Sequence, residues 1–230
     1  MSEMLSNSVF FGVMASILAY ELGVFLKKKT KLAICNPLLV AIIAVIVLLA
    51  VLNIDYEDYK SGAQLLSYLL TPATVCLAIP LYEQISLLKK NIKAILAGIL
   101  SGVITSLVCI FVMSLIFGLD HEMYATLLPK SITTAIGMGV SEELGGIGAL
   151  TAAVIIVTGI FGNVVGEYVC RLFKIKESIA RGIAMGTSAH AIGNARAMEM
   201  GEIEGAMSSL SIAVAGLLTV VGASVFAQFL

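Results

Sequence analysis

Charged side chains are scarce in this 230-residue sequence. Only 13% of the residues are Asp, Glu, Lys or Arg, whereas soluble domains carry roughly 25%. Hydrophobic residues make up 59% of the chain, and the mean hydropathy is +1.03. The net charge of -1 leaves no basic surface of the kind that binds nucleic acid. The composition excludes an ordinary soluble domain and a nucleic-acid partner, and it predicts an all-α protein embedded in a lipid bilayer.

The motifs of common enzymes and metal sites are also missing. No GxSxG, HExxH or P-loop sequence occurs, and two histidines cannot build a His-rich metal site. The cysteines stand far apart, without CxxC or Cys/His ligand spacing; they are Cys35, Cys76, Cys109 and Cys170. We therefore expect no catalytic activity, no metal, no cofactor and no disulfide framework.

Six uncharged apolar runs meet or approach the length that crosses a membrane as a helix, about 20 residues. They are residues 4–20, 33–52, 63–82, 94–119, 144–166 and 205–230. The first run has neither the basic start nor the cleavage site of a signal peptide, so we expect it to remain as a span. Two further apolar segments are interrupted: residues 123–141 contain Lys130, and residues 182–195 contain His190.

Most basic residues fall in three clusters, which we expect in cytoplasmic loops because short loops rich in Lys and Arg stay on that side. The clusters are Lys27, Lys28, Lys29 and Lys31; Lys89, Lys90 and Lys93; and Arg171, Lys174, Lys176 and Arg181. The loops between them are acidic and are expected outside, at Asp55, Glu57 and Asp58, at Asp120 and Glu122, and at Glu142 and Glu143. This pattern predicts an N-terminus outside the cell.

Under the same rule, residues 144–166 run inward, so the segment around Lys130 has to begin and end outside. We expect residues 123–143 to dip into the membrane and return. Irregular backbone at that depth indicates a cavity lined by protein or water. The alternative is that this segment crosses the membrane and the charge rule fails once.

The remainder of the chain is expected to cross twice more. Residues 182–195 would cross to an outer acidic loop, and a final helix would return inward; the loop contains Glu199, Glu202 and Glu204. This count gives a polytopic protein of about seven spans plus one re-entrant segment. Without linkers or low-complexity tracts, residues 1–230 are expected to form a single membrane domain.

Two of the predicted helices contain breaks. Pro72 and Pro80 interrupt one apolar run, and small or polar residues fill positions 186–194. A shift of about half the chain places Thr71 on Thr187, which suggests half-repeats 1–117 and 118–230. Interrupted segments in two inverted halves point to a transporter binding site. The alternative is that these are proline kinks of the kind also common in membrane helices that transport nothing.

Lys130 is the first candidate for binding a carboxylate, because it is a cation in an apolar segment beside the hydroxyls of Ser131, Thr133 and Thr134. The alternative is that Lys130 lies shallow and extends its ammonium to the headgroups.

Further candidates come from the second interrupted segment. Thr187, His190 and Asn194 are spaced i, i+3 and i+7, so they would share one face of a local helix. His190 could couple binding to a proton, or it could be a neutral interhelical hydrogen-bonding residue. Arg196 is either a second substrate cation or a partner of Glu199. Glycines four apart predict close helix approach; these pairs are Gly98 with Gly102, Gly162 with Gly166, and Gly182 with Gly186.

Two stretches resemble a known family. Residues 129–136 read PKSITTAI and residues 186–197 read GTSAHAIGNARA. They resemble the LrgB/CidB family of bacterial membrane proteins, whose members read PKS(V/I)TTPIA and G(T/S)xxHAIGTARA at these places. Residues 70–82 also resemble the third span of the family. Ala135 and Asn194 depart from the pattern, in which proline and threonine are usual.

The resemblance implies a bacterial cell (inner) membrane protein with one of two functions. Family members are described as antiholin-like or holin-like proteins that modulate murein hydrolase activity and cell lysis, together with a small LrgA/CidA-type membrane partner. The plastid glycolate/glycerate translocator is similar in its C-terminal part, and bacterial relatives are associated with pyruvate transport.

The residues favour a carrier of small monocarboxylates such as pyruvate, glycolate or glycerate. Lys130, Arg196 and the paired helix breaks would suit a small carboxylate, with Thr71 helping to shape the site. An antiholin-like regulator is the alternative, and association into a homo-oligomer is left open.

Overall fold

The structure is a computed structural model that describes residues 10–30, 37–69, 72, 75, 76 and 78–230. All regular elements in these ranges are helices. The chain divides into two compact units, residues 1–76 and residues 77–230, which are described separately.

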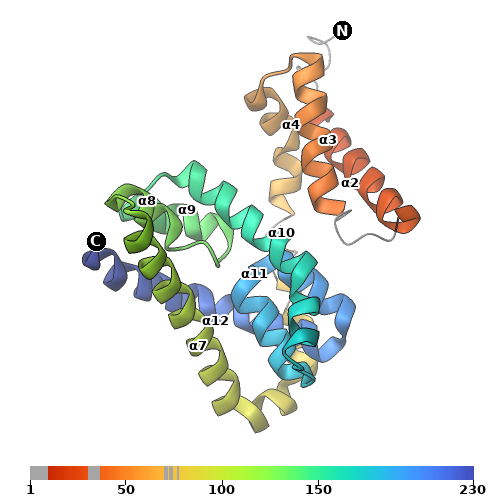
Figure 1. The fold of residues 1–230 in the computed structure, drawn as a ribbon. Helices are drawn as coiled ribbons and strands as arrows, with labels where there is room; N and C mark the ends of the chain where they lie inside the picture. The colour runs from red at the N-terminus through yellow and green to blue at the C-terminus, as the bar shows by residue number, and fades with distance from the viewer. Residues whose placement is uncertain (1–9, 31–36, 70–71, 73–74, 77) are drawn as a thin grey trace. The chain divides into compact units, whose positions relative to one another are not determined.

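The N-terminal unit contains three helices, α2 (Phe11–Thr30), α3 (Pro37–Leu52) and α4 (Tyr56–Tyr68) (Figure 1). The helices α2 and α4 pack closely at Gly12, where a Cβ atom would meet the backbone of α4. The Ser16 hydroxyl lies 2.7 Å from the Tyr59 hydroxyl and joins the same two helices. Thr71 and the residues that flank Pro72 lie outside the described residues. Pro80 belongs to the C-terminal unit and falls in the first turn of α6 (Ala78–Glu83), where a proline is tolerated.

The C-terminal unit is built around three long apolar helices, α7 (Ile85–Phe117), α10 (Gly148–Leu172) and α12 (Glu202–Phe226). Within the described ranges these are the helices long and apolar enough to cross a membrane. A short 3-10 turn (Ala227–Phe229) follows α12. The family resemblance and these helices agree on a helical membrane protein.

The helix α7 shows how one face is buried and the other is left apolar. Residues at intervals of three or four line its buried face; they are Ile95, Ile99, Val103, Leu107, Ile110 and Ser114. Leu96, Leu100 and Ile104 on the other side are each nearly half exposed, which suits contact with lipid. The helix ends at Gly118, whose φ of 61° is the left-handed conformation typical of a helix end.

A first helical hairpin, hairpin 1, occupies residues 121–144. Its arms are α8 (His121–Leu127), which is capped by the Asp120 carboxylate, and α9 (Thr134–Glu143). Pro129 lies in the turn between them. The two ends of hairpin 1 meet, since the His121 Nε2 atom lies 3.0 Å from the Leu144 carbonyl oxygen. The backbone therefore reverses, as the expected re-entrant segment requires.

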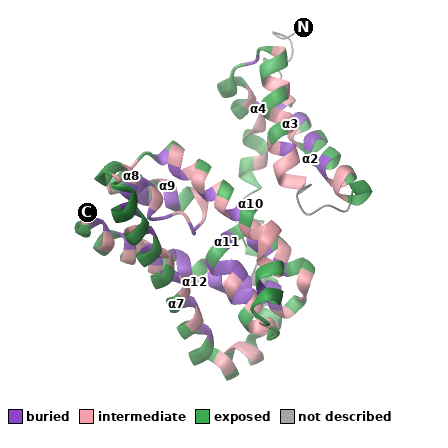
Figure 2. Cartoon of the chain, viewed as in Figure 1, coloured by how far each residue is buried: buried purple, intermediate pink, exposed green. Residues whose placement is uncertain are grey.

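A second hairpin, hairpin 2, is formed by α11 (Ser178–Met200). The predicted interruption is confirmed: His190 has φ 42° and ψ -140°, which breaks the helix into two arms. The second arm folds back, because Arg181 in the first arm forms an ion pair with Glu204 just after the second. Figure 2 shows buried residues gathered on α11 and on the first half of α12.

The prediction that residues 182–195 cross the membrane is therefore wrong. Both ends of hairpin 2 lie at one end of the unit, and α12 runs back to the other end, where the Leu230 carbonyl oxygen lies 2.6 Å from His121 Nδ1. The error came from reading acidic residues as markers of an outer loop. Glu199 and Glu204 instead pair with Arg196 and Arg181, and carboxylates carry little topological information.

The two ends of the C-terminal unit differ in charge. The basic end is where α7 begins and α10 ends, near Lys89, Lys93 and Arg171. The acidic end is where α7 ends and α10 begins, near Asp120 and Glu143. Hairpin 1 enters the unit from the acidic end, and hairpin 2 enters it from the basic end.

Candidate functional site

The tips of the two hairpins converge on Ile155, in the first third of α10. In hairpin 2, the His190 Nε2 atom lies 2.9 Å from the Ile155 carbonyl oxygen. In hairpin 1, Gly137 faces the Ile155 side chain so closely that a Cβ atom would clash with its Cδ1 atom. Two interrupted segments that are distant in sequence are thus brought to one place.

Lys130 is a half-buried cation whose described contacts are all neutral. Its ammonium donates to the Ser131 hydroxyl at 2.9 Å, and the Ser106 hydroxyl donates to the same oxygen at 3.3 Å. No carboxylate among the described residues lies within ion-pair distance of it. Thr133 precedes α9 without a side-chain capping bond. An ammonium in this position is a candidate for binding a small anion.

Hairpin 2 separates the residues that were predicted to share a face. Thr187 faces α7, where its hydroxyl lies 3.0 Å from the position of a Cβ atom on Gly102. His190 faces α10, and Asn194 faces α12, where it accepts a hydrogen bond from the Ser209 hydroxyl at 3.3 Å. The break at His190 disrupts the helical period, so the single-face prediction is wrong. The three residues remain buried.

Arg196 is occupied by carboxylates. Its guanidinium pairs with Glu199 at 2.6 Å and with Glu167 of α10. Glu167 also pairs with Arg171, as the spacing of four predicts. The structural alternative for Arg196, pairing with Glu199, is confirmed. This ion-pair network lies toward the basic end, away from the hairpin tips.

All three predicted glycine pairs surround the first arm of hairpin 2. Gly98 and Gly102 bring α7 against Ile183 and Thr187, and Gly162 and Gly166 bring α10 against Ala189 and Met185. The arm's own Gly182 and Gly186 face α12. A Cβ atom at Gly166, for example, would lie 2.5 Å from the Met185 sulfur. Side chains of the arm therefore pack directly on the glycines of α7 and α10, and the arm's own glycines meet the backbone of α12.

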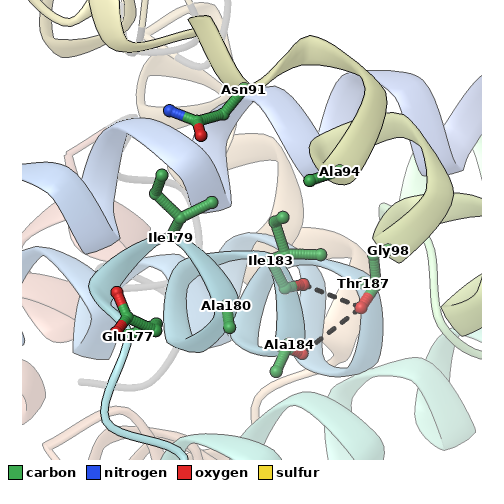
Figure 3. A pocket seen from close by; sticks show the side chains of 9 residues that line it. All are labelled: Asn91, Ala94, Gly98, Glu177, Ile179, Ala180, Ile183, Ala184 and Thr187. Carbon is green, nitrogen blue, oxygen red and sulfur yellow. Dashed lines mark hydrogen bonds between the residues drawn. The ribbon is translucent and has the colours of Figure 1, made fainter.

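A cavity of about 440 Å³ lies between the first half of α7 and the first arm of hairpin 2 (Figure 3). It extends from Asn91 and Glu177 at the basic end to Gly98 and Thr187. The Thr187 hydroxyl donates to the Ile183 carbonyl oxygen at 2.8 Å. The cavity thus connects the basic end with a residue three positions before His190.

A second cavity, of about 300 Å³, lies between the other half of α7 and hairpin 1. Lys130 and Ser114 are its polar residues, and the Ser114 hydroxyl is buried without a hydrogen-bond partner in the described chain. The remaining lining is apolar or weakly polar; it consists of Cys109, Ile110, Met113, Phe117, Leu119 and Leu127. Each cavity therefore lies beside the first arm of one hairpin.

Several residues of this region were not singled out from the sequence. A buried set of hydroxyls joins hairpin 1 to α10, with Thr151 donating to Ser141 at 2.7 Å and the Ile147 amide donating to Thr126 at 2.8 Å. His121 joins the ends of hairpin 1 and α12. Serine and threonine are common in apolar helices, and no local spacing identifies which of them meet across the fold.

The model of the LrgB-like family matches residues 16–229. The chain is 39% identical over 222 residues to antiholin-like protein LrgB of Bacillus cereus (strain B4264), covering 96% of both chains, and equally to that of Bacillus anthracis (strain CDC 684 / NRRL 3495). No solved structure matches. The predicted resemblance is confirmed, and the chain belongs to the LrgB-like family.

Proposed function

We propose that this chain is an antiholin-like membrane protein that restrains murein hydrolase activity and cell lysis, together with an LrgA/CidA-type partner. The support is the 39% identity, over 96% of the chain, to proteins named antiholin-like LrgB. This observation favours the regulator over the carrier that the residue analysis put first.

The regulator is tested in a bacterium whose own LrgB-type protein has been deleted. Expression of the chain with its partner should slow detergent-induced autolysis and lower extracellular murein hydrolase activity relative to the empty vector. Membrane levels are measured by immunoblot. An unchanged lysis rate at normal membrane levels of the protein would contradict the proposal.

A second candidate function is a carrier of small monocarboxylates, and Lys130 is the observation that favours it. Inserting a charge into the hydrocarbon region costs a few kcal/mol, so a half-buried ammonium without a described carboxylate partner suits an anion that binds reversibly. Ser131, Thr133 and Thr134 lie beside Lys130 in sequence and are proposed to orient the carboxylate. His190 of the other hairpin contacts Ile155, which Gly137 of hairpin 1 also faces. Its hydrogen bond to Ile155 is also what a structural histidine would make.

The carrier is tested by uptake of labelled pyruvate, glycolate and lactate into proteoliposomes, with and without the partner. Lys130→Ala should abolish uptake, whereas Lys176→Ala, an exposed lysine outside the hairpins, should leave it intact. Absence of uptake of any of these acids under any gradient would refute the carrier. If Lys130→Ala loses uptake but still restrains lysis, the two functions are separate.

For orientation, we propose that the basic end faces the cytoplasm of the bacterial inner membrane and that the N-terminus lies outside. Three spans before residue 85, followed by α7, α10 and α12, would give six crossings with two hairpins. This arrangement keeps the three basic clusters on one side. The proposed count is six crossings rather than seven, because residues 182–195 belong to hairpin 2 and are not counted as a crossing.

A further inference from the structure

We propose that hairpins 1 and 2 are two opposed gates, each with the helix that follows it, and that hairpin 2 controls access from the basic end to a site shared by both tips. The inference rests on the proposed carrier function. It assigns a direction of access and a moving element, which the candidate site alone does not.

The C-terminal unit contains two copies of one arrangement, a hairpin followed by a long helix, and the copies run in opposite directions. Hairpin 1 opens at the acidic end and is followed by α10, which runs to the basic end. Hairpin 2 opens at the basic end and is followed by α12, which runs to the acidic end. The repeat therefore lies within residues 121–226 and differs from the half-repeats 1–117 and 118–230. Inverted repeats with broken helices are a common basis of alternating access.

The tips of the two hairpins both contact Ile155. Ile155 presents its side chain to Gly137 of hairpin 1 and its carbonyl oxygen to His190 of hairpin 2. His190 adopts a positive φ, a conformation that is costly for a side chain of this size and that is frequent at functional sites. Gly159 is needed beside it, since a Cβ atom there would lie 2.7 Å from the His190 ring. Both tips therefore contact the same residue of α10.

The two cavities have corresponding positions in the unit. Each lies between α7 and the first arm of one hairpin, and each reaches toward a tip, at Thr187 in hairpin 2 and at Lys130 in hairpin 1. The cavity at the basic end is the larger, about 440 Å³ against about 300 Å³. It begins between Asn91 and Glu177, which can hold water, whereas the other cavity is apolar along most of its length. For this reason we place the water-accessible route on the basic side.

Hairpin 2 is held by ion pairs at its base and by contacts of its first arm with α7. Its base is fastened by ion pairs, Arg181 with Glu204 and Arg196 with Glu167. Its first arm contacts α7 at Gly98 and Gly102, beside the 440 Å³ cavity, and we propose that the arm moves into this cavity. A closing motion of the arm toward α7 would remove the 440 Å³ cavity and separate the basic end from the tips.

The arrangement of the hairpins is tested first, without any transport assay. In a cysteine-free background, Glu177→Cys and Glu202→Cys should both react with an impermeant maleimide from one side. Glu143→Cys and Gln228→Cys should react only from the other side. Labelling of positions 177 and 202 from opposite sides would overturn the two-gate arrangement.

Access is tested next by labelling at Ala184→Cys, which lines the cavity. The reagent should reach it from the side that labels position 177, and Met113→Cys in the other cavity is the matched control, which should stay unlabelled from that side. Labelling of Ala184→Cys only from the opposite side would overturn the assigned direction. These readouts remain informative even if the carrier function fails.

Motion is tested by a disulfide between Gly98→Cys and Ile183→Cys. A Cβ atom at position 98 would lie 3.4 Å from Cγ2 of Ile183, which is close enough for a bridge. Oxidation should slow uptake at least tenfold, reduction should restore it, and the single variants should not respond. Unchanged uptake with the disulfide verified by mass spectrometry would overturn the gate. Wild-type protein that transports nothing would refute the carrier instead.

Discussion

The ion pair between Arg181 and Glu204 allows a prediction whose size follows from exposure. The Glu204 side chain is 4% exposed, and the Arg181 side chain is 29% exposed. Removing one partner of a buried pair costs about 3–5 kcal/mol because a charge is left buried. Arg181→Met leaves the buried carboxylate alone, so we expect a loss near 3–5 kcal/mol. Glu204→Gln leaves the partly hydrated guanidinium, and we expect about 2 kcal/mol, close to one charge-assisted hydrogen bond.

Thermal unfolding in detergent measures these losses. The chain contains no tryptophan, so far-UV circular dichroism is a suitable probe. A loss of 2 kcal/mol corresponds to a fall in Tm of roughly 4–8 °C for a chain of this size. The double variant should lose less than the sum of the single variants. Glu202→Gln, an exposed neighbour, is the control and should shift Tm little. Equal losses for Arg181→Met and Glu202→Gln would refute the reasoning.

Three further predictions follow from other contacts. Hydrogen bonds to two carbonyl oxygens raise the pKa of His121 above its ordinary value of 6.5. The stabilisation from protonated His121 is therefore complete below pH 6.5 and is lost as the pH rises through the higher pKa of the folded state. Tm should fall over that pH range, and His121→Gln should make Tm less dependent on pH. Gly162→Val forces α10 away from Ala189 and should cost about 1–3 kcal/mol in thermal unfolding, with wild-type Tm as the contradicting result. Thr151→Val removes the bond to Ser141 and should cost about 1–3 kcal/mol, and hydrogen exchange should rise at the base of hairpin 1 but not in α12.

The sequence predicted those parts of the fold that depend on composition and local period. Uncharged runs located α7, α10 and α12, because crossing helices need long apolar segments. The interruptions near Lys130 and His190 were found because polar residues and Pro129 disturb those runs. Glycines four apart predicted close packing, and all three pairs pack closely.

The partners of charged and polar residues were not predictable in the same way. Glu204 looks like an outer-loop residue until Arg181, 23 positions earlier, is seen beside it. The sequence allowed an interhelical hydrogen bond at His190 but did not identify Ile155 as its partner. Such pairings depend on where the chain folds back, and a helical period calculated through residue 190 places Asn194 on the wrong face.

The glycines around hairpin 2 have a mechanical consequence. Helices with large side chains interlock as ridges in grooves, and moving one past another requires rotamer changes on both. The first arm instead meets α7 at Gly98 and Gly102, and α10 at Gly162 and Gly166. At these positions α7 and α10 present no side chain to the arm, so the proposed motion of the arm would require few rotamer changes on either helix. A methyl group added at one of these four glycines would hinder the motion of the arm without contacting a ligand.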